Sequence, residues 1–336
     1  MSLHPSLAAV RRGVRRELAG LGPGPVLVAC SGGADSLALL AATVAETRGT
    51  ERHVLGVTVD HALQAGSGEQ AARVVRQMAN LGVHETVTAR VQVRADGHGP
   101  EAAAREARYA VLGELAQRLA VVTVLLGHTR DDQAETVLLG LTRGSGGRSL
   151  AGMRRRFVAA GTSYARPLLD VARDDTETAC QVEGIAWWTD PHNLDPAFTR
   201  VRVRRTVLPL LEQQLGPGVA ATLARTADQL RADSELLDDL ADQRLAALRA
   251  GPDGRGLELV ALQRLPEALL TRVLRRAALE AGALGAELFY VHVQELARLV
   301  AARTGGPGPT QVQLPGHVTA VRAQDRLLFR ADPVTG

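Results

Sequence analysis

A strand, a glycine-rich turn and a helix start meet in the stretch Val26-Leu27-Val28-Ala29-Cys30-Ser31-Gly32-Gly33-Ala34-Asp35-Ser36. Gly32 and Gly33 allow close approach of the backbone to an anion and accept positive φ angles. The amides at the helix start then point at that anion, and the helix dipole favours its negative charge. Ser31 and Ser36 add hydroxyl donors, while Asp35 can hold Mg²⁺ or order the loop. The stretch therefore predicts a phosphate-binding loop.

This loop differs from two common nucleotide-binding motifs. It lacks the spacing and the lysine of a Walker A loop, and it is not Gly-x-Gly-x-x-Gly. The chain contains no lysine at all, so its 39 Lys+Arg residues are all arginine. A Schiff-base lysine and a catalytic side-chain amine are therefore excluded.

Composition indicates a globular protein with a substantial core. The 336 residues are 46% hydrophobic and 22% charged, with a formal net charge of +3. Two cysteines, Cys30 and Cys180, exclude a disulfide scaffold and a four-thiolate metal site. No apolar run approaches the ~18 residues of a membrane span. We therefore expect a reduced, cytoplasmic protein with no membrane partner.

Strand and helix patterns alternate along the first part of the chain. Strands are predicted at 26–28, 54–59, 87–93 and 121–126, and helices at 37–45, 68–81, 101–119 and 131–141. This alternation predicts an α/β fold with a doubly wound, mainly parallel sheet, whose ligands bind beyond the carboxyl ends of the strands.

The pattern changes near Gly216-Pro217-Gly218. Residues 219–250 and 257–303 have helical patterns, and two strand-like runs follow at 310–314 and 326–330. We predict a catalytic domain over 1–215 and a smaller, mainly helical domain over 216–336 that ends in a short β element.

A second polar constellation follows the fourth predicted strand, in the stretch Gly127-His128-Thr129-Arg130-Asp131-Asp132-Gln133-Ala134-Glu135-Thr136. Asp132 and Glu135 are three residues apart and share one helix face. With Asp131 they could hold a cationic substrate, Mg²⁺ or both. Alternatively, the acids complement the helix N-terminus and Thr129 caps it.

The Ser-Gly-Gly-x-Asp-Ser loop resembles the PP-loop of the ATP pyrophosphatases, which cleave ATP between its α and β phosphates. The second stretch, His-x-x-Asp-Asp-Gln-x-Glu-Thr, resembles the second motif of the tRNA(Ile)-lysidine synthetases within that group. Further matches follow in the order of that family and extend over residues 26–209: Val59-Asp60-His61, Glu101 to Tyr109, Arg143 to Met153, Arg166 to Leu169, Asp190 to Asn193, and Phe198 to Arg202.

The resemblance implies a two-step reaction that uses ATP and Mg²⁺. The wobble cytidine of tRNA(Ile) with anticodon CAU is adenylated, and free L-lysine then displaces AMP to give lysidine, which changes codon reading from AUG to AUA. The implied catalytic residues are Asp35, Asp132, Glu135 and Arg202, with Asp35 as the Mg²⁺ ligand. The implied nucleotide-binding residues are Ser31, Gly32, Gly33, Asp35, Ser36, Asp60, His61, Gly127 and His128. The implied substrate-binding residues are Asp131, Asp132, Glu135, Arg108, Arg143, Arg200, Arg202 and Arg205.

The resemblance also implies that the second domain binds tRNA, and a homodimer is possible. Val201 and His192 depart from residues common in the family, which leaves open which arginine meets the substrate. A related tRNA 2-thiolase is the main alternative, but it requires a catalytic cysteine or a cluster motif, and neither Cys30 nor Cys180 is well placed. A non-catalytic RNA-binding module would explain the basic clusters at 154–156 and 200–205, but not an acidic face opposite a phosphate loop.

Overall fold

A six-stranded sheet forms the centre of the first unit of the protein. The computed structural model describes residues 3–60, 67–91, 100–142, 146–190, 194–250, 256–302 and 309–331. The strand order is β3-β2-β1-β4-β6-β5, and every neighbouring pair except β5 with β6 is parallel. The strands are β1 (Val26–Ala29), β2 (Val54–Asp60), β3 (Glu85–Arg90), β4 (Thr123–Leu126), β5 (Arg156–Ala159) and β6 (Thr162–Ala165). The predicted doubly wound, mainly parallel sheet is confirmed.

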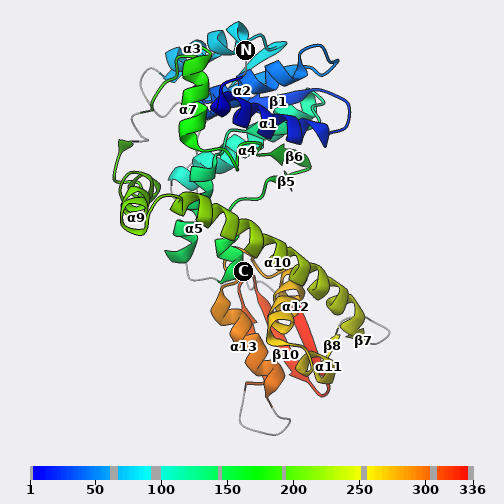
Figure 1. Cartoon of the computed structure of the whole chain (residues 1–336). Coiled ribbons are helices and arrows are strands. Elements are labelled where there is room, and N and C mark those ends of the chain that lie inside the picture. The colour runs from blue at the N-terminus through cyan, green and yellow to red at the C-terminus, as the bar shows by residue number, and fades with distance from the viewer. Residues whose placement is uncertain are drawn as a thin grey trace. The chain divides into compact units, whose positions relative to one another are not determined.

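Helices cover both faces of this sheet (Figure 1). One core cluster joins Val26 and Val28 of β1 to four helices, and a second joins Leu27 to Leu112 and Leu115 of α4. Successive residues of β1 therefore point to opposite faces, which explains why this strand is apolar throughout. The helices of the first cluster are α1 (Pro5–Ala19), α2 (Ala34–Thr47), α3 (Ser67–Asn80) and α7 (Arg173–Val182); α4 spans Pro100–Arg118.

The strand order reverses between β1 and β4. Strands β2 and β3 extend the sheet on one side of β1, whereas β4, β6 and β5 extend it on the other. A crevice for ligands is expected at this switch point, outside the carboxyl ends of the strands. The phosphate loop follows β1, and helix α5 (Arg130–Thr142), which carries the acidic residues, follows β4. Both predicted motifs therefore flank the switch point.

The hairpin of β5 and β6 was not predicted from sequence. Its two-residue turn consists of Ala160 and Gly161, with φ angles of 46° and 76°. Positive φ at both positions is the geometry of a type I′ turn, for which Asn-Gly is the usual signal. Because Ala160 stands where asparagine is usual, the sequence does not indicate this turn.

The second unit comprises residues Arg143–Ala151 and Asp228–Gly336. Its five-stranded sheet has the order β7-β8-β11-β10-β9, and the second half of α10 (Val219–Leu248) packs against this sheet with α11, α12 and α13 through one apolar core (Figure 1). The strands are β7 (Arg249–Ala250), β8 (Gly256–Glu258), β9 (Gln311–Leu314), β10 (Val318–Ala323) and β11 (Arg326–Ala331), and the helices are α6 (Gly147–Leu150), α11 (Leu259–Gln263), α12 (Glu267–Glu280) and α13 (Tyr290–Ala301).

The predicted helical stretch over 257–303 was wrong in detail. It begins with β8, which pairs antiparallel with β11, and it contains three separate helices. A three-residue strand is too short to show a period of two. The unit division falls within α10 (Val219–Leu248), between Ala227 and Asp228. The predicted boundary between residues 215 and 216, and the functions assigned to the two domains, stay predictions.

Three further helical segments complete the first unit. They are α8 (Thr199–Arg202), a π-helix over Val203–Val207 and α9 (Leu208–Leu215). Within the described part of the chain, none of the helices combines the length and apolar character needed to cross a membrane.

Helix α1 packs so closely on the segment after β6 that one of its residues must be glycine. A Cβ atom on Gly13 would lie 2.6 Å from the carbonyl oxygen of Pro167. We predict that Gly13→Ala lowers the free energy of unfolding by about 2 kcal/mol, because the helix must move away from backbone atoms. Urea denaturation measures this loss. Gly68→Ala in α3 is the control, since no atom lies within 4 Å of its added Cβ; equal effects of the two substitutions would contradict this packing.

Candidate active site

The phosphate loop is held in shape by its own hydrogen bonds. Gly32 has a φ angle of 84°, and a Cβ there would lie 2.6 Å from Cγ2 of Val74. The Ser36 hydroxyl donates to the Gly33 carbonyl at 2.9 Å and accepts from the Ser31 amide at 3.1 Å. Ser36 therefore closes the loop, and both the conformation of Gly32 and its close contact require glycine.

The carboxyl end of β4 passes directly beside this loop. A Cβ on Gly127 would lie 3.1 Å from the carbonyl group of Asp35 and from Cα of Ser36. Only glycine permits this approach without a shift of the backbone. The structure thus brings the two predicted motifs together.

Asp131 and Asp132 each organise a neighbouring backbone segment. The Asp132 carboxylate accepts hydrogen bonds from the Thr129 amide at 2.9 Å and the Thr129 hydroxyl at 3.1 Å. Asp131 accepts from the Arg173 amide at 2.8 Å, at the first residue of α7. Capping therefore runs opposite to the expectation: the Asp132 side chain accepts from the Thr129 amide, which precedes the first residue of α5.

Three arginines contact the carboxylates of Asp35, Asp132 and Glu135. Arg173 contacts three acids, at 3.4 Å from Asp35, 3.0 Å from Asp132 and 3.4 Å from Glu135. Glu135 is fully buried. We call these residues, together with the two arginines described next, the carboxylate–arginine cluster: Asp35, Asp132, Glu135, Arg173, Arg200 and Arg204.

Arg200 and Arg204 complete the cluster. Arg200 Nε lies 2.9 Å from Glu135, and its Nη2 also donates to the Asp132 carbonyl and the Thr136 hydroxyl. Arg204 lies 2.6 Å from Glu135 and 3.0 Å from Asp132. Three positive and three negative side chains therefore neutralise one another, as buried charges require.

Sequence reasoning missed Arg173 and Arg204. Arg204 follows Arg200 by four residues and shares its helix face, so helical periodicity could have found it. Arg202 is exposed and donates instead to the carbonyls of Pro196 and Ala197, at 2.7 and 2.9 Å. Arg205 is also exposed. The proposed roles of Arg202 and Arg205 stay predictions.

The cluster separates the acidities of two of its carboxyl groups. Burial raises the pKa of Asp35 to about 6, against the attraction of Arg173. Burial also opposes ionisation of Asp132, but the charges of Arg173 and Arg204 act against it, and the pKa is lowered to about 2. Asp132 is therefore ionised while these arginines stay beside it, whereas Asp35 gains a full charge only above its raised pKa.

Two other predicted site residues lie in described elements of the first unit. Asp60 is buried at the end of β2, 3.7 Å from Arg90 Nε. Arg108 lies on α4, where burial lowers its pKa. His128 follows β4 and is discussed below. His61 and Arg143 lie outside the described residues.

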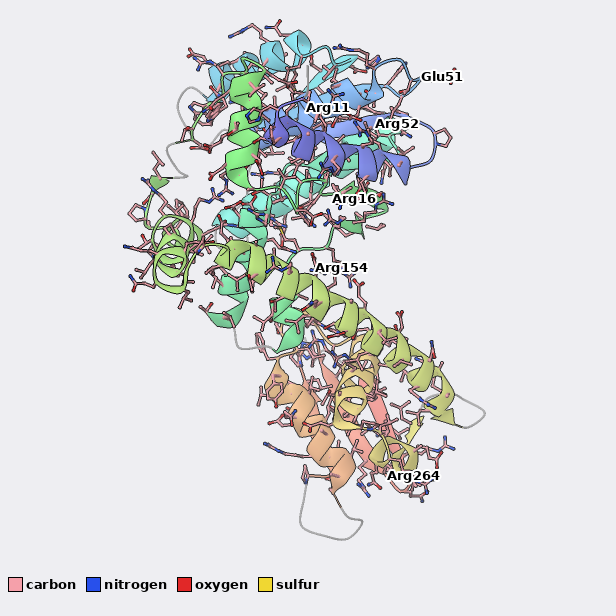
Figure 2. The ribbon with its side chains drawn as sticks, in the orientation of Figure 1. Arg11, Arg16, Glu51, Arg52, Arg154 and Arg264 are labelled. Atoms are coloured by element: carbon pink, nitrogen blue, oxygen red, sulfur yellow. The ribbon has the colours of Figure 1, made fainter. Side chains whose placement is uncertain are left out.

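The basic cluster at 154–156 is largely used for structure. Arg155 lies 2.7 Å from Asp170, which also pairs with Arg16 of α1, and Arg156 lies 2.5 Å from the buried Glu17. Figure 2 labels Arg16 and Arg154 on this unit. These ion pairs attach the hairpin and the segment after β6 to α1.

Both cysteines are buried beside the phosphate loop. Burial raises the pKa of Cys30, and it raises the pKa of Cys180 to about 12. Neither thiol is therefore an activated nucleophile in this environment.

Comparison with known proteins identifies two regions. Residues 9–211 match the PP-loop domain family, and residues 257–328 match the TilS substrate binding domain. The tRNA(Ile)-lysidine synthase of Streptomyces coelicolor is 47% identical, with 98% of this chain and 99% of the relative covered. That of Salinispora arenicola is 50% identical, with 97% of both covered. The U34-tRNA thiolase NcsA from Methanococcus maripaludis shares the fold, with a TM-score of 0.56 at 15% identity over 67% of this chain and 78% of that chain.

The bridging position of Arg173 predicts a large effect on stability. Arg173→Leu removes the one cation among the described residues that contacts all three acids, and we expect the free energy of unfolding to fall by about 3 kcal/mol. Denaturant unfolding measures the loss. Arg202→Leu makes the same change at an exposed arginine and should stay within about 0.5 kcal/mol of the unsubstituted protein. Equal losses in the two variants would show that the contacts of Arg173 with the three acids add no stability beyond that of an exposed arginine.

Proposed function

Because the chain belongs to the tRNA(Ile)-lysidine synthase family, it is an ATP-using ligase that modifies tRNA, and we propose that it joins L-lysine to the wobble cytidine of tRNA(Ile) with anticodon CAU. One observation carries the assignment of the site. The phosphate loop and the carboxylate–arginine cluster meet at Asp35, which belongs to the loop stretch and contacts Arg173 of the cluster, beside the switch point between β1 and β4. A site for ATP and a site for a charged amine are thereby adjacent.

The first step uses the phosphate loop. Cytidine O2 attacks the α-phosphorus of ATP, the bond to the bridging oxygen breaks, and pyrophosphate leaves. The amides at the start of α2 and the glycine turn bind the phosphate oxygens. Ser31 and Ser36 shape this turn, and Gly127 leaves room for it.

Asp35 is suited to hold Mg²⁺ beside the phosphates. Mg²⁺ typically binds one or two carboxylates together with phosphates and water, and it neutralises phosphate charge when bound. The Asp35 side chain is 24% exposed, and its carboxylate lies 3.4 Å from Arg173. A nearby cation would favour its ionised form, so its raised pKa fits a site that is completed by a metal.

The second step uses the acids of α5. The ε-amine of lysine attacks C2 of the adenylated cytidine, the C2–O2 bond breaks, and AMP leaves with O2. One amine proton must be removed, and Asp132 and Glu135 are the carboxylates placed to bind the ammonium and take part in that transfer.

Lysine must exchange with a guanidinium to reach these acids. Among the described residues, the side-chain hydrogen bonds of Arg204 go only to Asp132 and Glu135. Arg200 has additional bonds outside the pair, and Arg173 is held by Asp35. Arg204 is therefore the cation most easily replaced, and once released it can bind an anionic group of a substrate.

The second unit is proposed to bind the tRNA, because the TilS substrate binding domain match lies within it. A cytoplasmic location follows from this substrate. A homodimer stays a proposal that light scattering can test. The 2-thiolase alternative is disfavoured by the buried thiols Cys30 and Cys180.

Mass analysis of the tRNA tests the reaction directly. Incubation of the CAU-anticodon tRNA with ATP and L-lysine should add one lysine to the wobble cytidine, with equal amounts of AMP and pyrophosphate. Omission of lysine should prevent the mass increase. Lysine-independent modification, or incorporation of sulfur from a sulfur donor, would reject this function.

Substitution of Asp132 tests the amine site. Asp132→Asn keeps the shape but removes the charge, and we expect kcat/KM for lysine to fall about 100-fold. Binding of tRNA, measured by filter binding, should change little. Asp170→Asn is the control, since Asp170 also pairs with two arginines but lies on the surface. Lysine dependence in Asp132→Asn equal to that of the unsubstituted enzyme would rule out the assigned role.

A further inference from the structure

Arg166 is a buried arginine that the reaction described above does not use. Its side chain lies at the end of β6, and the residue is only 4% exposed. One Nη atom donates to the Arg154 carbonyl and the other lies 3.4 Å from the Tyr109 hydroxyl. Its Cζ lies 4.3 Å from the centre of the Phe157 ring. The guanidinium is therefore fixed in position on several sides.

A third donor of this guanidinium, the Nε–H group, points at His128. Arg166 Nε lies 3.3 Å from His128 Nδ1. An arginine N–H can only donate, because the guanidinium has no acceptor and stays charged. His128 Nδ1 must therefore accept the hydrogen bond, which requires that it carries no proton.

The charges around His128 also favour the neutral ring. Burial lowers the pKa of His128 to about 3, and the nearby cations Arg166, Arg105 and Arg200 act in the same direction. Asp132 opposes them. A neutral imidazole without a proton on Nδ1 carries its proton on Nε2.

We propose that Arg166 is a positioning residue that holds His128 in the neutral tautomer with the proton on Nε2, so that His128 donates a hydrogen bond to a phosphate oxygen of ATP. The inference rests on the proposed function, because it needs ATP at the carboxyl end of β4. Gly127, the residue before His128, packs against the backbone of Asp35 and Ser36. Among the described residues, His128 Nε2 has no hydrogen-bond partner, so this donor is available to a ligand.

This tautomer determines whether His128 can donate or accept a proton in the site. An imidazole with its proton on Nε2 stabilises charge on an oxygen but cannot remove a proton through that nitrogen. His128 is thereby excluded as the base for the lysine ammonium. The carboxylates of α5 remain as the groups that receive this proton.

Nitrogen NMR of the full-length protein tests the tautomer. Histidine labelled with ¹⁵N gives distinct signals for protonated and unprotonated ring nitrogens, and His128→Gln identifies the signals of His128 by their loss. We expect a protonated Nε2 and a bare Nδ1 from pH 5.5 to 8. A proton on Nδ1, or titration of the ring in this range, would overturn the proposal. This result needs neither tRNA nor lysine, so it is independent of lysidine formation.

Substitution of Arg166 tests the cause. Arg166→Met removes the donor and the charge, and we expect His128 to populate both tautomers and to titrate at a higher pH. Arg155→Met is the control, since Arg155 pairs with Asp170 and is not among the charges that act on His128. Unchanged His128 signals in a folded Arg166→Met protein would show that Arg166 does not set the tautomer.

Pyrophosphate release with ATP, tRNA and lysine tests the use of the donor. The amide nitrogen of glutamine can replace a donor at Nε2, so His128→Gln should retain activity within about 10-fold. His128→Leu has no donor and should lose about 100-fold or more. Equal losses in both variants would contradict a donor role. Pyrophosphate release without lysidine would instead reject the proposed function and leave the tautomer result standing.

Discussion

Charge neutralisation at the carboxyl ends of β1 and β4 is the constraint on which the arrangement of the first unit depends. Asp35, Asp132 and Glu135 come from two helices and enter a region where an unpaired charge is costly. Their counter-ions come from α7, α8 and the π-helix, which are distant in sequence. The cluster therefore joins five elements around the switch point, and loss of one ion leaves the others unbalanced.

This balance also shapes how a substrate can enter. The acids are already oriented by Thr129 and by the arginines, so the site needs little reorganisation to bind a cation. A new ammonium can enter without a large penalty only if a guanidinium leaves. A π-helix carries Arg204, and such segments occur often at functional sites. In the proposed function, binding of an amine and release of Arg204 toward an anionic group are therefore coupled.

The sequence predicted those parts of the site whose signals are local. The glycine turn at Ser31–Ser36 and the acids at Asp131–Glu135 each directly follow an apolar strand. Parallel topology then requires both to lie at the same edge. Their partners are not local: Arg173 is 138 residues from Asp35, and Arg204 is 69 from Glu135. The β5–β6 hairpin and β8 were missed for a related reason, because an atypical turn and a very short strand leave little pattern.

Because the chain contains no lysine, the cations that the protein itself places beside Asp132 and Glu135 differ chemically from a lysine substrate. All 39 basic side chains are arginine, and a guanidinium keeps its proton at any physiological pH. Its fork also allows Arg173 to contact three carboxylates and Arg166 to contact a histidine, a carbonyl and a hydroxyl. While arginines occupy Asp132 and Glu135, these cations do not transfer a proton to the acids, because a guanidinium keeps its proton. In the proposed reaction, an incoming lysine brings an ammonium that can lose its proton and become a nucleophile, so proton transfer to the acids would follow replacement of the protein's own cation by the substrate.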